Sequence, residues 1–344
     1  MIYNDNKYLV CINCLTYNQS EFITDAMNGF VMQETSFPFV ATIIDDSSTD
    51  DEQNVISSYL EDHFDHSDKT GYKQWETEDA YWTFARHKEN KNCYFVVVFL
   101  KRNLFKESEK KNEVVKEWMQ TKYLALCEGD DYWTDPFKLQ KQVDFMESHP
   151  DYAICYHHVK ILNALTNEFE DDDELYNGIP EDFSIKELAI RNCIHTNSVL
   201  YRNDVHAWEK VLRLGTTIVK DYANHMFHAE GGLIKRLPDI MGVYRKGVGV
   251  WSRDESFLNK NLEWLISISK TSALLDNPET KKIIERQINN IKTDSIQYVN
   301  SIKDQVHSLM SSNEFRVGQM FTRRFPLLSK MIIKIGNRHK QKQD

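Results

Sequence analysis

Residues 123–136 read YLALCEGDDYWTDP, and this stretch gives the clearest indication of the fold. It begins with a short apolar run, as expected of a strand that is covered on both faces. An acidic turn with Asp130 and Asp131 follows, and Asp135-Pro136 then precedes apolar residues that recur at helical spacing. A buried strand that leads through an acidic turn into a helix predicts a βα unit, and such units bind ligands at the strand end.

Two similar units precede this stretch. Apolar runs at residues 9–15 and 39–44 each end in a polar turn and lead into a helical pattern, and residues 94–100 form a further apolar run. We expect Ser20 to cap the first helix, and a cap of the second helix by Ser47 or Ser48 is an alternative interpretation of the polar residues 45–50. The order predicts an α/β fold with a mostly parallel central sheet flanked by helices. Residues 61–92 are polar, charged and aromatic, and we interpret them as an insertion.

The C-terminal part of the chain is predicted to be helical. Leu258, Leu262 and Leu265 indicate one helix, and Asn277-Pro278 is expected to cap and begin a long amphipathic helix, or two in line. We expect the apolar face of this second segment to pack on the rest of the chain or on a partner, so an oligomer is compatible with the sequence.

The charge of the chain is distributed unevenly. The chain has 344 residues and a net charge of −10, which argues against nucleic acid as a partner because phosphate backbones bind basic surfaces. Residues 315–344 instead hold eight Lys or Arg and one acidic residue, interspersed with apolar side chains. This basic amphipathic tail suggests peripheral contact with an anionic membrane, and ordinary helix packing explains it equally well.

The sequence also indicates the compartment. We interpret the six cysteines as buried thiols, since most lie in or beside apolar runs. Residues 1–7 lack the features of a signal peptide, and no apolar run reaches the ~18 residues of a membrane span. We therefore expect a cytoplasmic protein, peripheral at the inner face of the membrane if the tail binds lipid.

The acidic turn at residues 128–131, EGDD, predicts a divalent cation. Adjacent carboxylates repel one another and lose hydration on burial. Mg²⁺ or Mn²⁺ removes that cost, because it binds one or two carboxylates and completes its shell with phosphate oxygens and water. Tyr132 and Trp133 follow as candidate stacking groups. The alternative interpretation is a solvated acidic turn that caps the next helix.

The turns after the first two strands are candidates for nucleotide contacts. Asp45 and Asp46 can accept hydrogen bonds from a base or a ribose hydroxyl. The first turn, residues 16–19, has no glycine, whereas a dinucleotide-binding fold would have several there. This argues against a dehydrogenase, while backbone groups and the ring of Tyr17 can hold a base.

Taken in order, these segments resemble the family 2 glycosyltransferases of bacteria, which have the GT-A fold. The matching segments are Thr16-Tyr17-Asn18, Gln33, residues 45–50 (DDSSTD), residues 128–136 and residues 138–142 (KLQKQ). The resemblance covers roughly residues 8–252, and the ordered set is more specific than any single motif. It implies inverting transfer of a sugar from a nucleoside-diphosphate donor, often a UDP-sugar, with Mn²⁺ or Mg²⁺.

Carried over by position, the resemblance implies a role for each matching residue. Asp130 and Asp131 would lie at the metal and the diphosphate. Glu128 stands where the family usually has Asp, which leaves open whether it binds the ribose, binds the metal through water, or does neither. The residues that would face the nucleotide are Thr16, Tyr17, Asn18, Asp45 or Asp46, and Asn103.

The acceptor side also has a match. Asp221 stands at the family's general base, which takes the acceptor's hydroxyl proton as the oxygen attacks the anomeric carbon. Lys220 departs from the usual partner, and a nearby cation lowers the pKa of an Asp and weakens it as a base. A surface helix residue is the alternative interpretation of Asp221.

Further matches lie near the donor sugar and over the donor. His195, Thr196 and Trp133 match segments near the donor sugar and acceptor. Arg245 and Trp251 belong to residues 244–252, which resemble the loop that folds over the donor. There Arg245 would pair with the diphosphate.

We therefore predict a GT-A catalytic domain over residues 1–252 and a helical region with a basic tail over residues 253–344. The predicted activity moves a sugar from a nucleoside-diphosphate sugar, with UDP favoured, to a hydroxyl of a glycan or lipid-linked glycan, as in polysaccharide biosynthesis. One alternative is a nucleotidyltransferase of related fold, which would need a basic, Gly-rich first turn. Another is a non-catalytic nucleotide-sugar-binding protein, against which the acidic pair and Asp221 argue.

Overall fold

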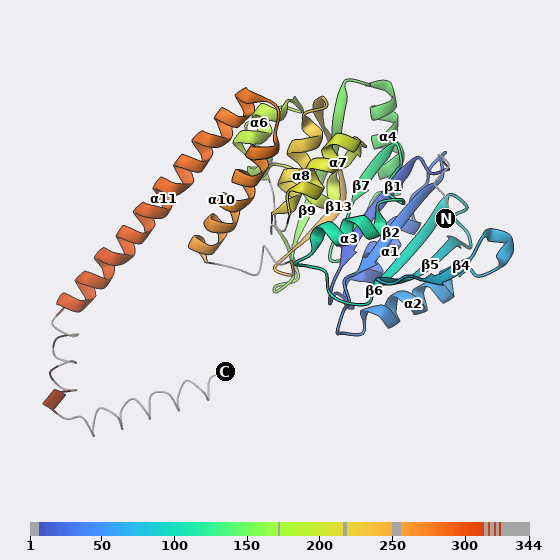
Figure 1. Ribbon diagram of the computed structural model, residues 1–344, viewed down its shortest axis with the longest axis horizontal. Coiled ribbons are helices and arrows are strands. Elements are labelled where there is room, and N and C mark those ends of the chain that lie inside the picture. The colour runs from blue at the N-terminus through green and yellow to red at the C-terminus, as the bar shows by residue number, and fades with distance from the viewer. Residues whose placement is uncertain are drawn as a thin grey trace. The chain divides into compact units, whose positions relative to one another are not determined.

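The computed structural model describes residues 7–170, 173–215, 219–249 and 256–312, together with residues 316, 320, 323 and 324. Contacts within the chain divide it into two compact units, residues 1–288 and residues 289–344. The first unit is built on one large mixed sheet, which holds 13 strands of the described residues (Figure 1).

Four parallel strands form the centre of this sheet. In spatial order they are β7 (Tyr123–Leu126), β1 (Val10–Thr16), β2 (Phe39–Asp45) and β6 (Cys93–Leu100). Most of their residues are buried, because helices cover both faces. The predicted α/β fold is thus confirmed, and each of the four predicted strands lies within a residue or two of its expected place.

Helices cover the two faces as separate layers (Figure 1). α1 (Ile23–Val31), α2 (Glu52–His63) and α4 (Lys138–Ser148) pack with alternate strand residues into one core. α3 (Ser108–Val115), α7 (Val205–Arg213) and α8 (Lys220–Ala229) lie against the other face. Successive side chains of a strand point to opposite faces of the sheet. Leu200 thus belongs to the first core, whereas the Tyr201 ring stacks on His228 of α8 on the other face.

Residues 64–87, within the segment that we interpreted as an insertion, extend the sheet. They form β3 (Phe64–Asp65), β4 (Lys73–Glu76) and β5 (Ala80–His87), and β5 pairs antiparallel with β6. β5 has mostly buried residues, among them Trp82 and Phe84. The many charged residues around it concealed this strand in the sequence.

The opposite half of the sheet is also partly antiparallel. β12 (Leu200–Arg202) pairs antiparallel with both β7 and β9 (Tyr152–Asn163), and β9 pairs parallel with β13 (Leu233–Lys246). The remaining short elements are β8 (Tyr132–Trp133), β10 (Glu168–Glu170), β11 (Asp182–Phe183), α5 (Asp173–Tyr176), α6 (Ile185–Ile190) and the 3₁₀ helices η1 (Asp68–Thr70) and η2 (Thr196–Ser198).

The two helix caps considered in the sequence are not formed. α1 begins at Ile23 after an N-cap at Phe22, because the Ser20 backbone N–H donates to Asp50 and the Gln19 carbonyl organises the turn. α2 begins at Glu52, beyond the expected caps. Ser47 has a positive φ of 62°, and the Ser48 hydroxyl donates to Glu52, so neither side chain caps the helix in the expected way.

The C-terminal helices agree with the sequence pattern. α10 (Phe257–Leu274) is joined to α8 by a hydrogen bond from the Ser267 hydroxyl to the Val219 carbonyl. α11 (Pro278–Ser311) begins as predicted, since Asn277 Oδ1 accepts from the backbone N–H groups of residues 279 and 280. Among the described helices, none is long and apolar enough to cross a membrane. All six cysteines are buried and unpaired, as predicted.

Candidate active site

Three strand ends meet at one edge of the sheet. Thr16 is paired with Asp45 across β1 and β2, and the Asp46 N–H donates to the Thr16 carbonyl at 3.0 Å. The Gly129 N–H, from the turn after β7, donates to the Leu15 carbonyl at 3.0 Å. The two predicted acidic clusters are therefore neighbours, as the rule for carboxyl ends of parallel strands requires.

Both carboxylates of the turn after β2 have partners within the protein. Asp45 is fully buried and accepts a hydrogen bond from the Ser48 N–H at 3.2 Å. Asp46 forms an ion pair with Lys111 of α3 at 3.0 Å and accepts from a backbone N–H. Asn103 lies beside them, and its side-chain amide donates to the Asp46 carbonyl at 3.0 Å. These carboxylates hold the walls of the site in place.

The turn after β1 is joined to the turn after β2. Asn18, at a φ of 54°, accepts from the Thr49 N–H at 2.7 Å, and its own N–H donates to the Ser48 hydroxyl at 2.9 Å. Thr16 is buried, whereas the Tyr17 ring is 45% exposed. Tyr17 and Asn18 are thus the exposed members of these three predicted contacts, and the Asn18 side chain is already bonded to Thr49.

The acidic turn after β7 packs tightly on the first turn. A Cβ at position 129 would lie 2.4 Å from Thr16 Oγ1 and 2.5 Å from Gln19 Oε1, so only glycine fits there. Asp131 is buried, and its carboxylate accepts from the Arg245 N–H at 2.8 Å. This contact connects the acidic turn to the end of β13.

Arg245 is held by two further contacts. Its guanidinium donates to the Asp130 carbonyl at 2.7 Å and forms an ion pair with Asp25 of α1. The side chain thus fixes the backbone of the acidic turn, a contact that the sequence did not indicate. Its predicted pairing with a diphosphate would add to these bonds.

Four carboxyl groups share this region. Burial raises the pKa of Glu128, and the charges of Asp130 and Asp221 raise it further. The pKa of Asp131 is raised well above its usual value by burial and then by Asp130. Glu128 is an exposed residue, yet the surrounding protein still removes much of the hydration of its carboxyl group. Because the charge of Asp221 contributes to the raised pKa of Glu128, Asp221 of α8 lies near the turn after β7.

Asp221 lies in the first turn of α8, partly buried. Burial raises its pKa, while the N–H groups at the helix start, nearby His195 and a hydrogen bond with the Thr196 side chain oppose this effect. The neighbouring Lys220 does not reverse the net rise, contrary to the concern raised by the sequence. The ring centroid of His195 lies 4.9 Å from that of Tyr244, whose pKa the same carboxylates raise after burial.

One of the sequence candidates, Trp133, does not join this group. Trp133 is 2% exposed, packs on Phe30 and donates its indole N–H to the Asn197 carbonyl at 2.7 Å. Its ring belongs to the core and not to the surface of the site, because α4 and the sheet enclose it. Trp251 lies outside the described residues.

The acidic group fits a divalent cation in charge but is not a complete protein cage. In the described part of the chain, no three His, Cys, Asp or Glu side chains are arranged to hold a metal ion by themselves. Mg²⁺ and Mn²⁺ sites that receive most ligands from phosphate and water need only one or two carboxylates. The pKa of Asp131 is raised because its ionised form is buried beside another carboxylate. A bound cation would stabilise that ionised form and so offset both effects.

Sequence reasoning missed Glu52, Asp25 and Lys111. Each contacts a predicted site residue, namely Thr16, Arg245 and Asp46 respectively. A lone charged residue on an amphipathic helix has no sequence signature, so only the fold identifies Asp25 and Lys111. For Glu52 a weak signal existed, since it follows the acidic motif and begins the helix.

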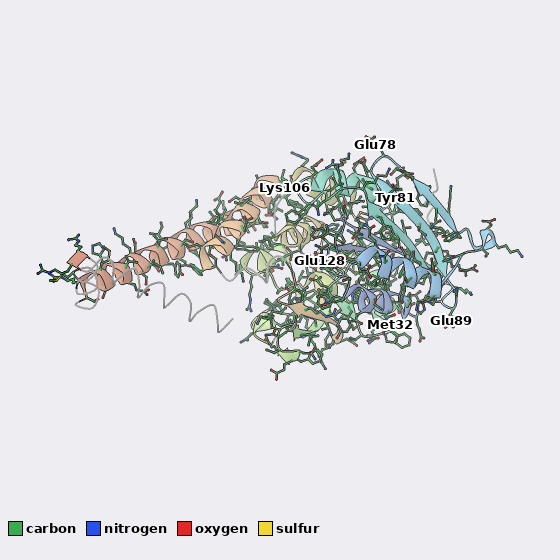
Figure 2. All side chains as sticks on the ribbon, turned by 90° about the horizontal axis from the view of Figure 1, so that it is seen from below. Met32, Glu78, Tyr81, Glu89, Lys106 and Glu128 are labelled. Atoms are coloured by element: carbon green, nitrogen blue, oxygen red, sulfur yellow. The ribbon has the colours of Figure 1, made fainter. Side chains whose placement is uncertain are left out.

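A separate hollow lies away from this group. It has a volume of about 430 Å³ and is lined by residues 31–35 and 89–92, at the amino ends of the parallel strands. Met32 and Glu89 mark it in Figure 2, apart from Glu128. Because ligands of open α/β sheets bind at the carboxyl ends, we place the candidate site at the acidic turns.

Comparisons with solved structures define the class of fold. The chain has the GT-A fold of known glycosyltransferases. TarS residues 1–349 of S. aureus, in complex with UDP-GlcNAc, superposes with a TM-score of 0.53 and 15% identity, over 91% of this chain and 80% of that one. The mannosyltransferase PcManGT of Pyrobaculum calidifontis, in complex with GDP-Man and Mn²⁺, gives a TM-score of 0.52 at 11% identity, over 92% and 84%.

Sequence relatives are closer in identity but carry no assigned activity. Uncharacterized protein Mb1547 of Mycobacterium bovis and Uncharacterized protein Rv1520 of Mycobacterium tuberculosis are each 33% identical to the chain over 247 residues. The match covers 69% of this chain and 59% of the length of each relative. No family model matches the chain.

Proposed function

We propose that the chain is an inverting glycosyltransferase that moves a sugar, metal-assisted, from a nucleoside-diphosphate sugar to a hydroxyl group. The observation that carries the proposal is the approach of Asp221 to the acidic turn at Glu128. One carboxylate beside a diphosphate-binding acidic turn is the arrangement that base-assisted transfer needs. The GT-A fold supports the same reading, and we assign residues 1–252 as the catalytic domain.

On the donor side, we propose that the turns after β1 and β2 hold the nucleotide. Tyr17 is exposed there, and Thr16, Asn18, Asp45, Asp46 and Asn103 form the wall around it. Asp130 and Asp131 would face the diphosphate through Mn²⁺ or Mg²⁺, which neutralises the charge that develops on the leaving group. Both structural neighbours were solved with a nucleotide sugar, one with Mn²⁺. UDP remains our favoured nucleotide.

On the acceptor side, we propose that Asp221 takes the proton of the attacking hydroxyl. Its pKa is raised by burial, which brings the group nearer to working pH and makes it a stronger base than a free aspartate. The hydrogen bond with Thr196 orients the carboxylate. His195 would lie beside the sugar, and Arg245 would complete the diphosphate contacts. We propose a glycan or lipid-linked glycan as the acceptor.

The test is release of free nucleoside diphosphate from UDP-, GDP-, TDP- and ADP-sugars, with Mn²⁺ and with EDTA. A glycosyltransferase should hydrolyse one donor slowly, and EDTA should abolish the release. Absence of release from every donor, together with absence of Mn²⁺-dependent UDP binding by calorimetry, would contradict the proposal. Nucleotide binding without turnover, in the presence of candidate acceptors, would instead support the non-catalytic alternative.

A further inference from the structure

Glu52 is a buried carboxylate at the junction of the strand-end turns. It is the first residue of α2 and is fully buried. Acidic side chains are rarely buried without partners, because the loss of hydration is costly. Burial accordingly raises the pKa of Glu52, opposed by its hydrogen bonds.

Three groups from two turns donate to this carboxylate. From the turn after β1, the Thr16 hydroxyl contacts Oε1 and the Gln19 N–H donates to Oε2 at 3.0 Å. From the turn after β2, the Ser48 hydroxyl donates to Oε2 at 2.7 Å. One side chain therefore joins the two turns that would hold the nucleotide.

The residues bonded to Glu52 also pack against the third turn, the acidic turn after β7. Thr16 and Gln19 are the side chains against which Gly129 lies, with no room for a Cβ. A displacement of either side chain would change the place of the acidic turn, because buried groups in close contact move together. Glu52 itself is buried behind the first turn and does not need to touch a ligand.

We propose that Glu52 is a positioning residue of the donor site: its carboxylate sets the turn after β1 against the turn after β2 and against the acidic turn after β7. This inference rests on the proposed function for the identity of the ligand. The bonds of one residue, Glu52, thus determine the shape of the site. None of the sequence motifs includes Glu52.

The test is the affinity for UDP, with Mn²⁺, of the Glu52→Gln variant. Glutamine has the same shape but only one acceptor oxygen, and an amide oxygen accepts more weakly than a carboxylate. Whichever way the amide is turned, at least one of the three donors loses its bond to residue 52 and the others are weakened. We expect UDP to bind at least tenfold more weakly. Ser57→Ala is the matched control, since Ser57 donates only to the Gln53 carbonyl within α2. That control should bind UDP as the wild type does.

A double-mutant cycle with Thr16→Ala separates positioning from general loss of stability. If Glu52 acts through the turn after β1, the effects on UDP affinity will not add, and the double variant will bind about as weakly as the weaker single variant. Faster hydrogen exchange of the Gln19 N–H in Glu52→Gln, but not in Ser57→Ala, should accompany the loss. Additive effects or unchanged exchange would contradict the proposal.

The outcomes are distinguishable from failure of the proposed function. Wild-type protein that binds neither UDP nor another nucleotide overturns the donor site itself, and Glu52 with it. Wild-type protein that binds UDP while folded Glu52→Gln binds it equally well overturns only the role of Glu52. If Glu52→Gln does not fold, Ser48→Ala removes one of the three donors, and a weaker UDP affinity in that variant is the expected result.

Discussion

At the scale of single residues, the chemistry depends on how burial changes ordinary carboxyl groups. Asp221 and Asp131 are common acidic residues in sequence, yet the pKa of each is raised because the folded chain removes water from it. The carboxylate of a group with a raised pKa is a stronger base toward a hydroxyl group. A buried carboxylate that lies beside another one is also stabilised by a bound cation. The two residues are suited to the two different roles by their neighbours.

The first prediction concerns Asp221. Asp221→Asn should leave UDP affinity unchanged and slow transfer by ~10²–10⁴-fold, the usual contribution of a general base. Since the pKa of Asp221 is raised, wild-type kcat should fall on acidification, beginning at a higher pH than for a free aspartate. Rates at saturating donor and acceptor across a pH series measure both effects. A wild-type rate in the variant would remove Asp221 from the mechanism.

The second prediction concerns Asp131. Asp131→Asn should lose the Mn²⁺-dependent part of UDP affinity, because an amide is a poor ligand for a hard cation compared with a carboxylate. The amide oxygen can still accept from the Arg245 N–H, so the fold should be retained. Calorimetric titration of UDP with Mn²⁺ and with EDTA measures this. Asp144→Asn, on the exposed face of α4, is the control, and equal Mn²⁺-dependent affinity in both variants would contradict the metal assignment.

At the scale of elements, α4 carries a buried charge that the sequence did not single out. Lys138, its first residue, is fully buried, and its ammonium group lies 3.8 Å from the centroid of the Trp133 ring without a hydrogen-bond partner in the described structure. Burial lowers its pKa to about 7. The segment at residues 138–142 resembled a family motif, and the structure gives its first residue a place in the core beneath the acidic turn.

The third prediction follows from this lysine. In the unfolded chain Lys138 titrates near its usual value of 10.5, so the unfolded state binds more protons between pH 7 and pH 10.5 and stability rises with pH in that window. Relative to Lys138→Met, the wild type should gain about 2 kcal/mol between pH 7 and pH 9. Urea unfolding of both proteins at the two pH values measures the difference. An equal pH dependence of the two would show that Lys138 keeps its proton when folded.

The elements also show which parts of the fold the sequence revealed. The four buried parallel strands were predicted because their apolar runs are continuous, and the Asn277-Pro278 helix start was predicted because its capping is local. β5 was missed because its alternation is surrounded by charged residues. The cap expected at Ser20 and the alternative cap at Ser48 do not form, because both residues bond across turns to Asp50 and Glu52. Contacts of this kind leave no mark on sequence spacing.

At the scale of the whole molecule, the fourth prediction concerns the basic tail. Residues 315–344 carry eight Lys or Arg against one acidic residue, on a chain whose total charge is −10. We expect binding to vesicles of anionic lipid that weakens as salt rises, because each basic residue near the surface contributes about 1 kcal/mol. Co-sedimentation of the full chain and of a variant without residues 315–344 measures this. Equal binding of both at low salt would exclude the tail as the contact.

The sequence by itself determined the α/β class, the places of the central strands and the candidate residues at their ends, because apolar runs and acidic turns are local patterns. The rule for strand ends and the family resemblance indicated one site, but the sequence could not determine which of these residues contact one another. Only the tertiary structure brings Asp221 of α8 to the acidic turn, gives Glu52 its three donors and buries Trp133 in the core. The physical reason is that burial and the contacts between distant turns depend on the packing of the whole sheet, which no local stretch of sequence specifies.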